Sequence, residues 1–138
     1  MKILKNIGIV LFAFLVLTLT ACDGTELPDG MNADELMAAG QNVVLLLVEE
    51  EYEALYELLR EDQRGSVTVD KIRSIVSDEL EGAGYYKQIE KRMVTGTKEK
   101  GVHYGVAMFY CEFSEKDVLI RVCFDAQLQL VGFSLMRD

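Results

Sequence analysis

The clearest residue for chemistry in this sequence is a thiol near the start of the chain. Cys22 directly follows the tripeptide LTA, at the end of an apolar segment. A thiol at such a boundary is suited to acylation, and an acyl chain can hold a protein at a membrane. By contrast, the chain has a single histidine, His103, and no Gly-x-Ser-x-Gly motif. The chemistry that the sequence indicates is therefore attachment rather than catalysis.

The segment before Cys22 has the parts of a secretory signal peptide. Lys2 and Lys5 form a cationic start, residues 7–17 are apolar apart from one glycine, and small residues lead to Ala21. A membrane-spanning helix needs about 20 predominantly apolar residues, and this run is shorter. The boundary resembles the lipobox of bacterial lipoproteins, which implies cleavage between Ala21 and Cys22 and lipid attachment at Cys22. We therefore expect a lipid-anchored protein on the outer, extracytoplasmic face of the cell membrane.

Length and charge limit the other possibilities. Without the leader, residues 1–21, the chain keeps 117 of its 138 residues, which is the size of one domain. The formal net charge is −9, and the two lysines lost with the leader bring the mature chain to −11. Such a charge repels phosphate backbones, so we expect no nucleic acid partner. Residues 22–30 are typical of a lipidated tether, and residues 31–138 of a single domain.

The first half of the domain has helical periodicity. Asn32, with Glu35 three residues later, predicts a helix start. The apolar run 43–48 predicts a helix that is buried on all sides. Three glutamates, 49–51, then begin a second helix or a kinked continuation, and residues 61–66 are polar, as in a loop. A third helix is predicted to begin near Thr68 and to stop at Gly82 and Gly84.

From residue 85 the period changes to two, which predicts strands. Four are expected, roughly at 85–95, 102–113, 118–124 and 128–136, and the short polar connections between them favour antiparallel pairing. The predicted fold class is α+β, with two to three N-terminal helices packed on one face of a four-stranded antiparallel, curved meander sheet.

A strand register follows if the apolar residues share one face. Phe113 then pairs with Val118, which puts Tyr110 opposite Arg121, and a two-residue turn at 126–127 joins the last two strands. The second face is mixed in character. It is either an ordinary solvated surface or a partner or self-association surface centred on Tyr110 and Arg121.

The same register places Cys111 and Cys123 on opposite faces, which predicts that they form no disulfide. Cys111 is expected to be a buried small hydrophobe and Cys123 an outward, half-covered thiol. His103 is expected to be an exposed hairpin residue, and we predict no catalytic residue, metal site or cofactor. Four strand tyrosines suit either packing or a small-ligand pocket: Tyr85, Tyr86, Tyr104 and Tyr110.

Longer stretches of the mature domain resemble a known family. They are NVVLLLVEEEYEALYELL, VTVDKIRSIV, GAGYY and VLIRVCFDAQLQLVGFSL. The chain resembles the bacterial family known as domain of unknown function 3887, and the order of its elements resembles the nuclear-transport-factor-2-like (cystatin-like cone) superfamily. The family leads us to expect a glycine-containing turn where residues 49–51 are glutamates. The resemblance also implies small lipoproteins or accessory domains beside hydrolases.

Three functions remain open from the sequence. The first is a non-catalytic, membrane-tethered binding module, which would hold a small apolar ligand between helices and sheet, or an envelope protein or second copy on the outer sheet face. The second, implied by the superfamily resemblance, is an isomerase-type enzyme. Its chemistry would need a carboxylate and a tyrosine in an apolar pocket, and the predicted apolar sheet face has no Asp or Glu. The third is an assembly accessory for an envelope hydrolase.

Overall fold

A computed structural model describes residues 26–137. The leader, the predicted cleavage site and Cys22 lie outside the described residues. Helices come first and strands follow. The elements are α4 (Ala33–Val48), α5 (Tyr52–Leu58), α6 (Glu61–Arg64), α7 (Val69–Leu80), β1 (Tyr86–Glu99), β2 (Val102–Phe113), β3 (Asp117–Phe124) and β4 (Leu130–Arg137). The predicted α+β class is confirmed.

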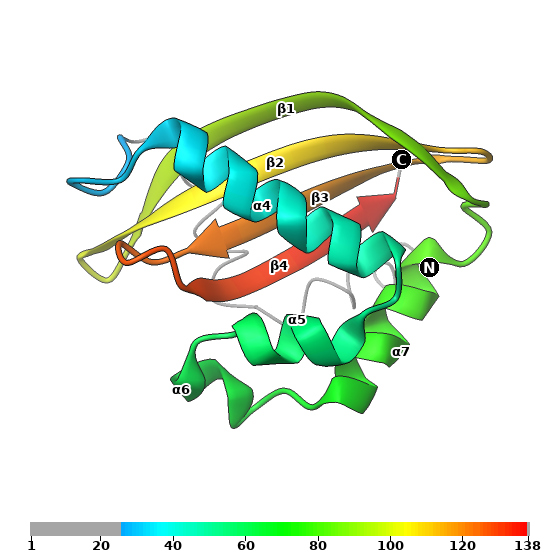
Figure 1. The fold of residues 1–138 in the computed structure, drawn as a ribbon, viewed down its shortest axis with the longest axis horizontal. Helices are drawn as coiled ribbons and strands as arrows, with labels where there is room; N and C mark the ends of the chain where they lie inside the picture. Colours follow the sequence, from blue (N-terminus) through cyan, green and yellow to red (C-terminus); the bar gives the residue numbers. More distant parts are fainter. Residues whose placement is uncertain (1–25, 138) are drawn as a thin grey trace.

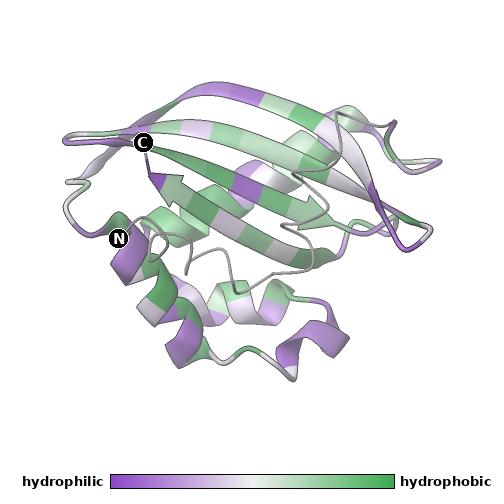
Figure 2. Ribbon diagram, turned by 180° about the vertical axis from the view of Figure 1, so that it is seen from behind, coloured by the Kyte–Doolittle hydropathy of each residue, from purple (hydrophilic) through white to green (hydrophobic). Residues whose placement is uncertain are grey.

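The four strands form one antiparallel sheet in the order β1-β2-β3-β4. Helix α4 lies diagonally across one face of this sheet, while α5 and α7 lie beyond the β4 edge (Figure 1). The apolar core fills the space between α4 and the sheet, around Leu36, Leu47, Phe109 and Ile120. The other face of the sheet, seen in Figure 2, is called the outer face below.

Both predicted helix starts are confirmed by their hydrogen bonds. The Asn32 side chain accepts from the backbone N–H groups of Asp34 and Glu35, at 2.7 and 3.1 Å. The Thr68 hydroxyl oxygen accepts from the N–H of Lys71 at 3.1 Å and caps α7. These side chains satisfy donors that a helix leaves unpaired at its first turn.

Two helical expectations are wrong. The run 43–48 is not buried all round, because α4 covers the sheet with one side only and leaves Leu45 40% exposed. Residues 61–66 are not simply a loop, since they include the short helix α6.

The break between α4 and α5 occurs at Glu50, whose backbone is left-handed with φ 58°. Glycine is the residue that adopts this conformation at least cost. The turn that the family resemblance led us to expect is therefore present, with a glutamate at its left-handed position.

The predicted register between β2 and β3 is wrong by two residues. Cys111, rather than Phe113, lies opposite Val118, and Met108 lies opposite Arg121. The strands close through a turn tighter than expected, in which the Phe113 N–H bonds to the Lys116 carbonyl at 3.0 Å. Backbone groups at 83 and 85 bind this turn and stabilise it from far away in the sequence.

The register between β3 and β4 also differs by two residues, with Val122 opposite Phe133. The predicted two-residue turn is a three-residue loop, in which the Asp125 N–H bonds to the Gln129 carbonyl at 3.0 Å. Leu128 takes the left-handed position, with φ 64°. A glycine at this position would have allowed the three-residue loop to be predicted from the sequence.

Because both register errors are two residues along most of the strands, the faces assigned there remain correct. An irregularity between Cys123 and Phe124 then pairs Phe124 with Leu130, so Leu130 lies on the buried side and not on the outer face.

The cysteine predictions hold in part. Cys111 and Cys123 are both free thiols, and the register places them on opposite faces. Cys111 is buried in the core as expected. Cys123 is also buried, at 3% exposure, and is not the half-covered thiol that we expected.

Candidate functional site

The outer face of the sheet carries a group of large apolar side chains. Met93 pairs with Met108 across β1 and β2, while Tyr110, Leu119 and Met136 form one row across β2, β3 and β4. Tyr110 and Met93 are exposed, at 37% and 39%, and the other three are half-buried. We call these five residues the outer-face patch. Figure 2 shows that hydrophobic stretches of β2, β3 and β4 lie side by side in the sheet.

Arg121 lies next to the patch and forms no ion pair with any acid in the described range, residues 26–137. Its cross-strand neighbours are Met108 on β2 and Ser134 on β4. Its Nε is buried and has no hydrogen-bond partner. Among residues 26–137, the ion pairs use other cations, namely Arg60, Arg73 and Lys87. A partly buried guanidinium without a carboxylate is energetically unfavourable until a partner supplies one.

The structure places Tyr110 and Arg121 on the same face, although not directly opposite each other. Tyr110 lies opposite Leu119, and Arg121 is two residues further along β3, so the two side chains are diagonal neighbours on one face. The ammonium of Lys91 stands over the Tyr110 ring at 5.3 Å from the ring centre. Tyr110 is thus fixed beside one cation and close to a second.

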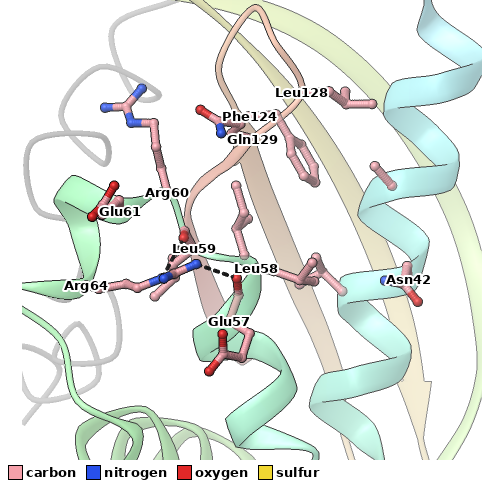
Figure 3. A pocket seen from close by; sticks show the side chains of 13 residues that line it. Asn42, Glu57, Leu58, Leu59, Arg60, Glu61, Arg64, Phe124, Leu128 and Gln129 are labelled. Atoms are coloured by element: carbon pink, nitrogen blue, oxygen red, sulfur yellow. Dashed lines mark hydrogen bonds between the residues drawn. The ribbon is translucent and has the colours of Figure 1, made fainter.

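A pocket of about 480 Å³ opens at the other end of the molecule, between α4, the α5–α6 junction and the loop that joins β3 to β4 (Figure 3). The residues that line it share no local sequence signal, because they come from three distant segments. They are Ala39, Asn42 and Val43; Glu57, Leu58, Leu59, Arg60, Glu61 and Arg64; and Phe124, Leu128, Gln129 and Leu130.

Arg60 fastens this end of the fold. Its guanidinium binds Asp62 at 2.7 and 3.0 Å and Asp125 at 3.1 Å, and its backbone N–H bonds to the Leu130 carbonyl at 2.7 Å. The carboxylates raise the pKa of Arg60, and Arg60 in turn lowers the pKa of Asp62. Sequence reasoning missed this network, although an aspartate at the start of a turn is a recognisable signal.

Asp125 holds the loop between β3 and β4. One of its carboxylate oxygens accepts from the N–H groups of Gln127 and Gln129, each at 2.9 Å, and the other binds Arg60. Both oxygens of this buried acid are therefore occupied in shaping the loop. An isomerase-type reaction would need a carboxylate that is free to take a proton, and Asp125 is not placed for that role.

The other residues singled out from the sequence, the strand tyrosines and His103, do not form a common site. Tyr85 is 68% exposed, and Tyr86 packs edge-on against the Phe113 ring. Tyr104 is buried, and burial raises its pKa, while the nearby Arg60 acts in the opposite direction. His103 lies exposed on β2 beside the β1–β2 turn.

In the part of the chain that the structure describes, no group of three His, Cys, Asp or Glu side chains could hold a metal ion. Within the same residues, no helix has the length and apolar character required to cross a membrane.

Of the comparisons with known proteins, one shows a family and another a similar fold. No curated protein matches the sequence. A solved NMR structure of a protein from Ruminococcus gnavus ATCC 29149 is similar, with a TM-score of 0.67 and 22% sequence identity, over 80% of this chain and 96% of that one. At this identity the likeness supports the fold alone. The family described as "Protein of unknown function (DUF3887)" matches residues 40–133, which is more than half of the chain. The chain therefore belongs to the DUF3887 family.

Proposed function

We propose that the protein is a membrane-tethered, extracytoplasmic binding module that docks an envelope protein on its outer sheet face. The observation that carries this proposal is Arg121, a partly buried cation beside five apolar side chains with no carboxylate partner among residues 26–137. The formal charge of the whole chain is −9, because acidic side chains outnumber basic ones. An unpaired arginine is unexpected in such a chain unless a partner supplies the opposite charge.

The chemistry of the face defines the partner. Arginine and tyrosine at the centre of an apolar surface are the residue types that dominate binding energy at protein interfaces. We therefore infer a protein segment that presents one carboxylate to Arg121 and apolar side chains to Tyr110 and the outer-face patch. This face holds a hollow of about 260 Å³, lined in part by Tyr110, Leu119 and Met136, which would receive an apolar side chain of that segment.

The tether supports the choice of an envelope protein. Leu27 already packs against the core, so the packed part of the chain begins within the predicted tether. With the lipid on Cys22, the five residues 22–26 can span at most about 18 Å. The domain would then work close to the membrane surface. The superfamily resemblance and the role beside hydrolases remain predictions, and no contact described above favours them.

The proposal can be tested with a photo-crosslinking amino acid in place of Tyr110, in cells that express the full chain. We expect one discrete adduct, whose cross-linked peptide contains Asp or Glu. We also expect the adduct to disappear in Arg121→Glu and to persist in Arg121→Lys. The same photo-crosslinker in place of Tyr85, which is exposed outside the patch, is the matched control.

Three results would contradict the proposal. One is the absence of any adduct, the second is the same adduct from both positions, and the third is an adduct that survives Arg121→Glu. An adduct with twice the mass of the chain would make a second copy the partner in place of an envelope protein.

A further inference from the structure

The pocket at the β3–β4 end of the fold has an apolar floor, and its rim carries both apolar and charged side chains. Buried side chains form the floor, namely Val43, Leu59, Phe124 and Leu130. Leu58, which is 42% exposed, and the half-buried Leu128 lie at its sides. Its volume of about 480 Å³ falls within the range of small-molecule sites.

Leu128 occupies a backbone conformation that disfavours its own side chain. Its φ is 64°, and a bulky residue rarely adopts this left-handed region. Strained residues persist where the surroundings fix them, and they cluster at functional sites. Here Asp125 binds the N–H groups of both neighbours of Leu128, and Arg60 binds Asp125. The loop therefore presents a leucine at the pocket where a glycine would fit with less strain.

The charges at the rim select one kind of head group. Glu57 and Glu61 line the pocket, and neither forms an ion pair with residues 26–137. The two arginines of the rim have other partners. Arg60 binds Asp62 and Asp125, and Arg64 donates to the backbone carbonyls of Leu59 and Glu57, at 3.0 and 2.7 Å (Figure 3). The carbonyls do not neutralise the charge of Arg64. With Arg60 paired, the two glutamates and Arg64 leave one net negative charge at the rim, which favours a cationic over an anionic head group.

From this arrangement we propose that the pocket binds a small amphiphile with an apolar tail and a cationic head group. The tail lies between Leu58 and Leu128 on the apolar floor, and the head group lies at Glu57 and Glu61. Leu128, which also packs against the core, is then a ligand-contacting residue as well. This site is separate from the outer-face patch and does not depend on it.

Three probes with the same tail test the head-group preference in the purified protein. We expect octylammonium to bind at least about fivefold more tightly than octanoate, with octanol between them, because the two carboxylates act at a solvent-exposed rim. Titrations followed by NMR should shift the amides of Val43, Phe124 and Leu128. Equal or tighter binding of octanoate, or shifts confined to other parts of the fold, would overturn the proposal.

Two glycine variants separate a binding role of Leu128 from a packing role. Leu128→Gly relieves backbone strain and removes the contact, so we expect octylammonium to bind about tenfold more weakly while the thermal midpoint stays near that of the wild type. Glu50→Gly relieves the same kind of strain away from the pocket, and it should raise the midpoint without changing the affinity.

If Leu128→Gly keeps the wild-type affinity, or if it lowers the midpoint as a core truncation does, Leu128 serves packing alone. Leu58→Ser changes a side chain that is 42% exposed, so it tests the same edge of the pocket with little loss of core packing. Unchanged octylammonium affinity in this second variant would also overturn the site. Tyr110→Ser, on the outer face, should leave the affinity unaltered.

Discussion

Gly40 allows α4 to pass close to β2, because it has no side chain on the face that meets Ala107 and Phe109. A Cβ atom at this position would lie 2.8 Å from the Ala107 Cβ and 2.9 Å from the Phe109 Cε2. Gly40→Ala forces these groups apart, and we expect it to lower the free energy of unfolding by about 1–2 kcal/mol, after allowance for the better helix propensity of alanine. Gly65→Ala, where the added Cβ meets open space, should change it by less than about 0.5 kcal/mol. Urea unfolding measures both, and equal effects would mean that α4 does not approach β2 this closely.

The buried thiol of Cys111 makes stability depend on alkaline pH. Burial raises its pKa from the ordinary 9.0 to about 12. The unfolded chain therefore loses this proton at a lower pH than the folded chain does. The stabilisation is complete below pH 9 and is lost as pH rises from 9 towards 12.

Denaturant unfolding across this range tests the effect. Stability should fall with pH in the wild type and less steeply in Cys111→Ala, which has no thiol to ionise. Parallel curves for the two proteins would show that Cys111 is not protected in the folded state.

At the scale of elements, the patterns that fill the core were predictable and the turn geometries were not. Asn32 and Thr68 mark helix starts because their side chains act on the next few residues. Strand faces followed from the period of two. Register failed because the β2–β3 turn is held from residues 83 and 85, and because the left-handed Leu128 gives no glycine signal.

The same reasoning explains how much of the site was predictable. Tyr110 and Arg121 share a face because side chains on one strand alternate, and a two-residue slip preserves that alternation. That Arg121 pairs with no acid in the part of the chain that the structure describes could not be foreseen, since ion pairing depends on where each acid lies in space. The pocket could not be foreseen either, since its walls come from three distant segments.

The junction of α5 and α6 is joined to the β3–β4 loop mainly by Arg60. Arg60→Leu removes the ion pair of the buried Asp125 carboxylate, and we expect a loss of about 1–3 kcal/mol in the free energy of unfolding. Hydrogen exchange at residues 126–130 should also become faster. The control is Arg73→Leu, because Arg73 pairs with the exposed Asp70 and lies over the Tyr52 ring at 5.6 Å, contacts that together contribute about 1 kcal/mol or less. If both variants lose the same stability, the Arg60 network does not secure the loop.

At the scale of the whole molecule, charge and attachment act together. Without the predicted leader the chain would carry a formal charge of −11, which would repel anionic lipid head groups, so the surface of the domain alone would not hold it at a membrane. The proposed lipid on Cys22 supplies that attachment, and the short tether would keep the outer-face patch near other envelope proteins. Cys22→Ser should therefore release the protein from the membrane fraction without unfolding it.

The most direct test of the tethered module is the intact mass of the chain isolated from the membranes of its host. The account predicts a chain that begins at Cys22 and carries a diacylglyceryl group on that sulfur, with residues 1–21 removed. A chain recovered from the cytosol at full length, with Met1 to Ala21 intact and no lipid on Cys22, would contradict it.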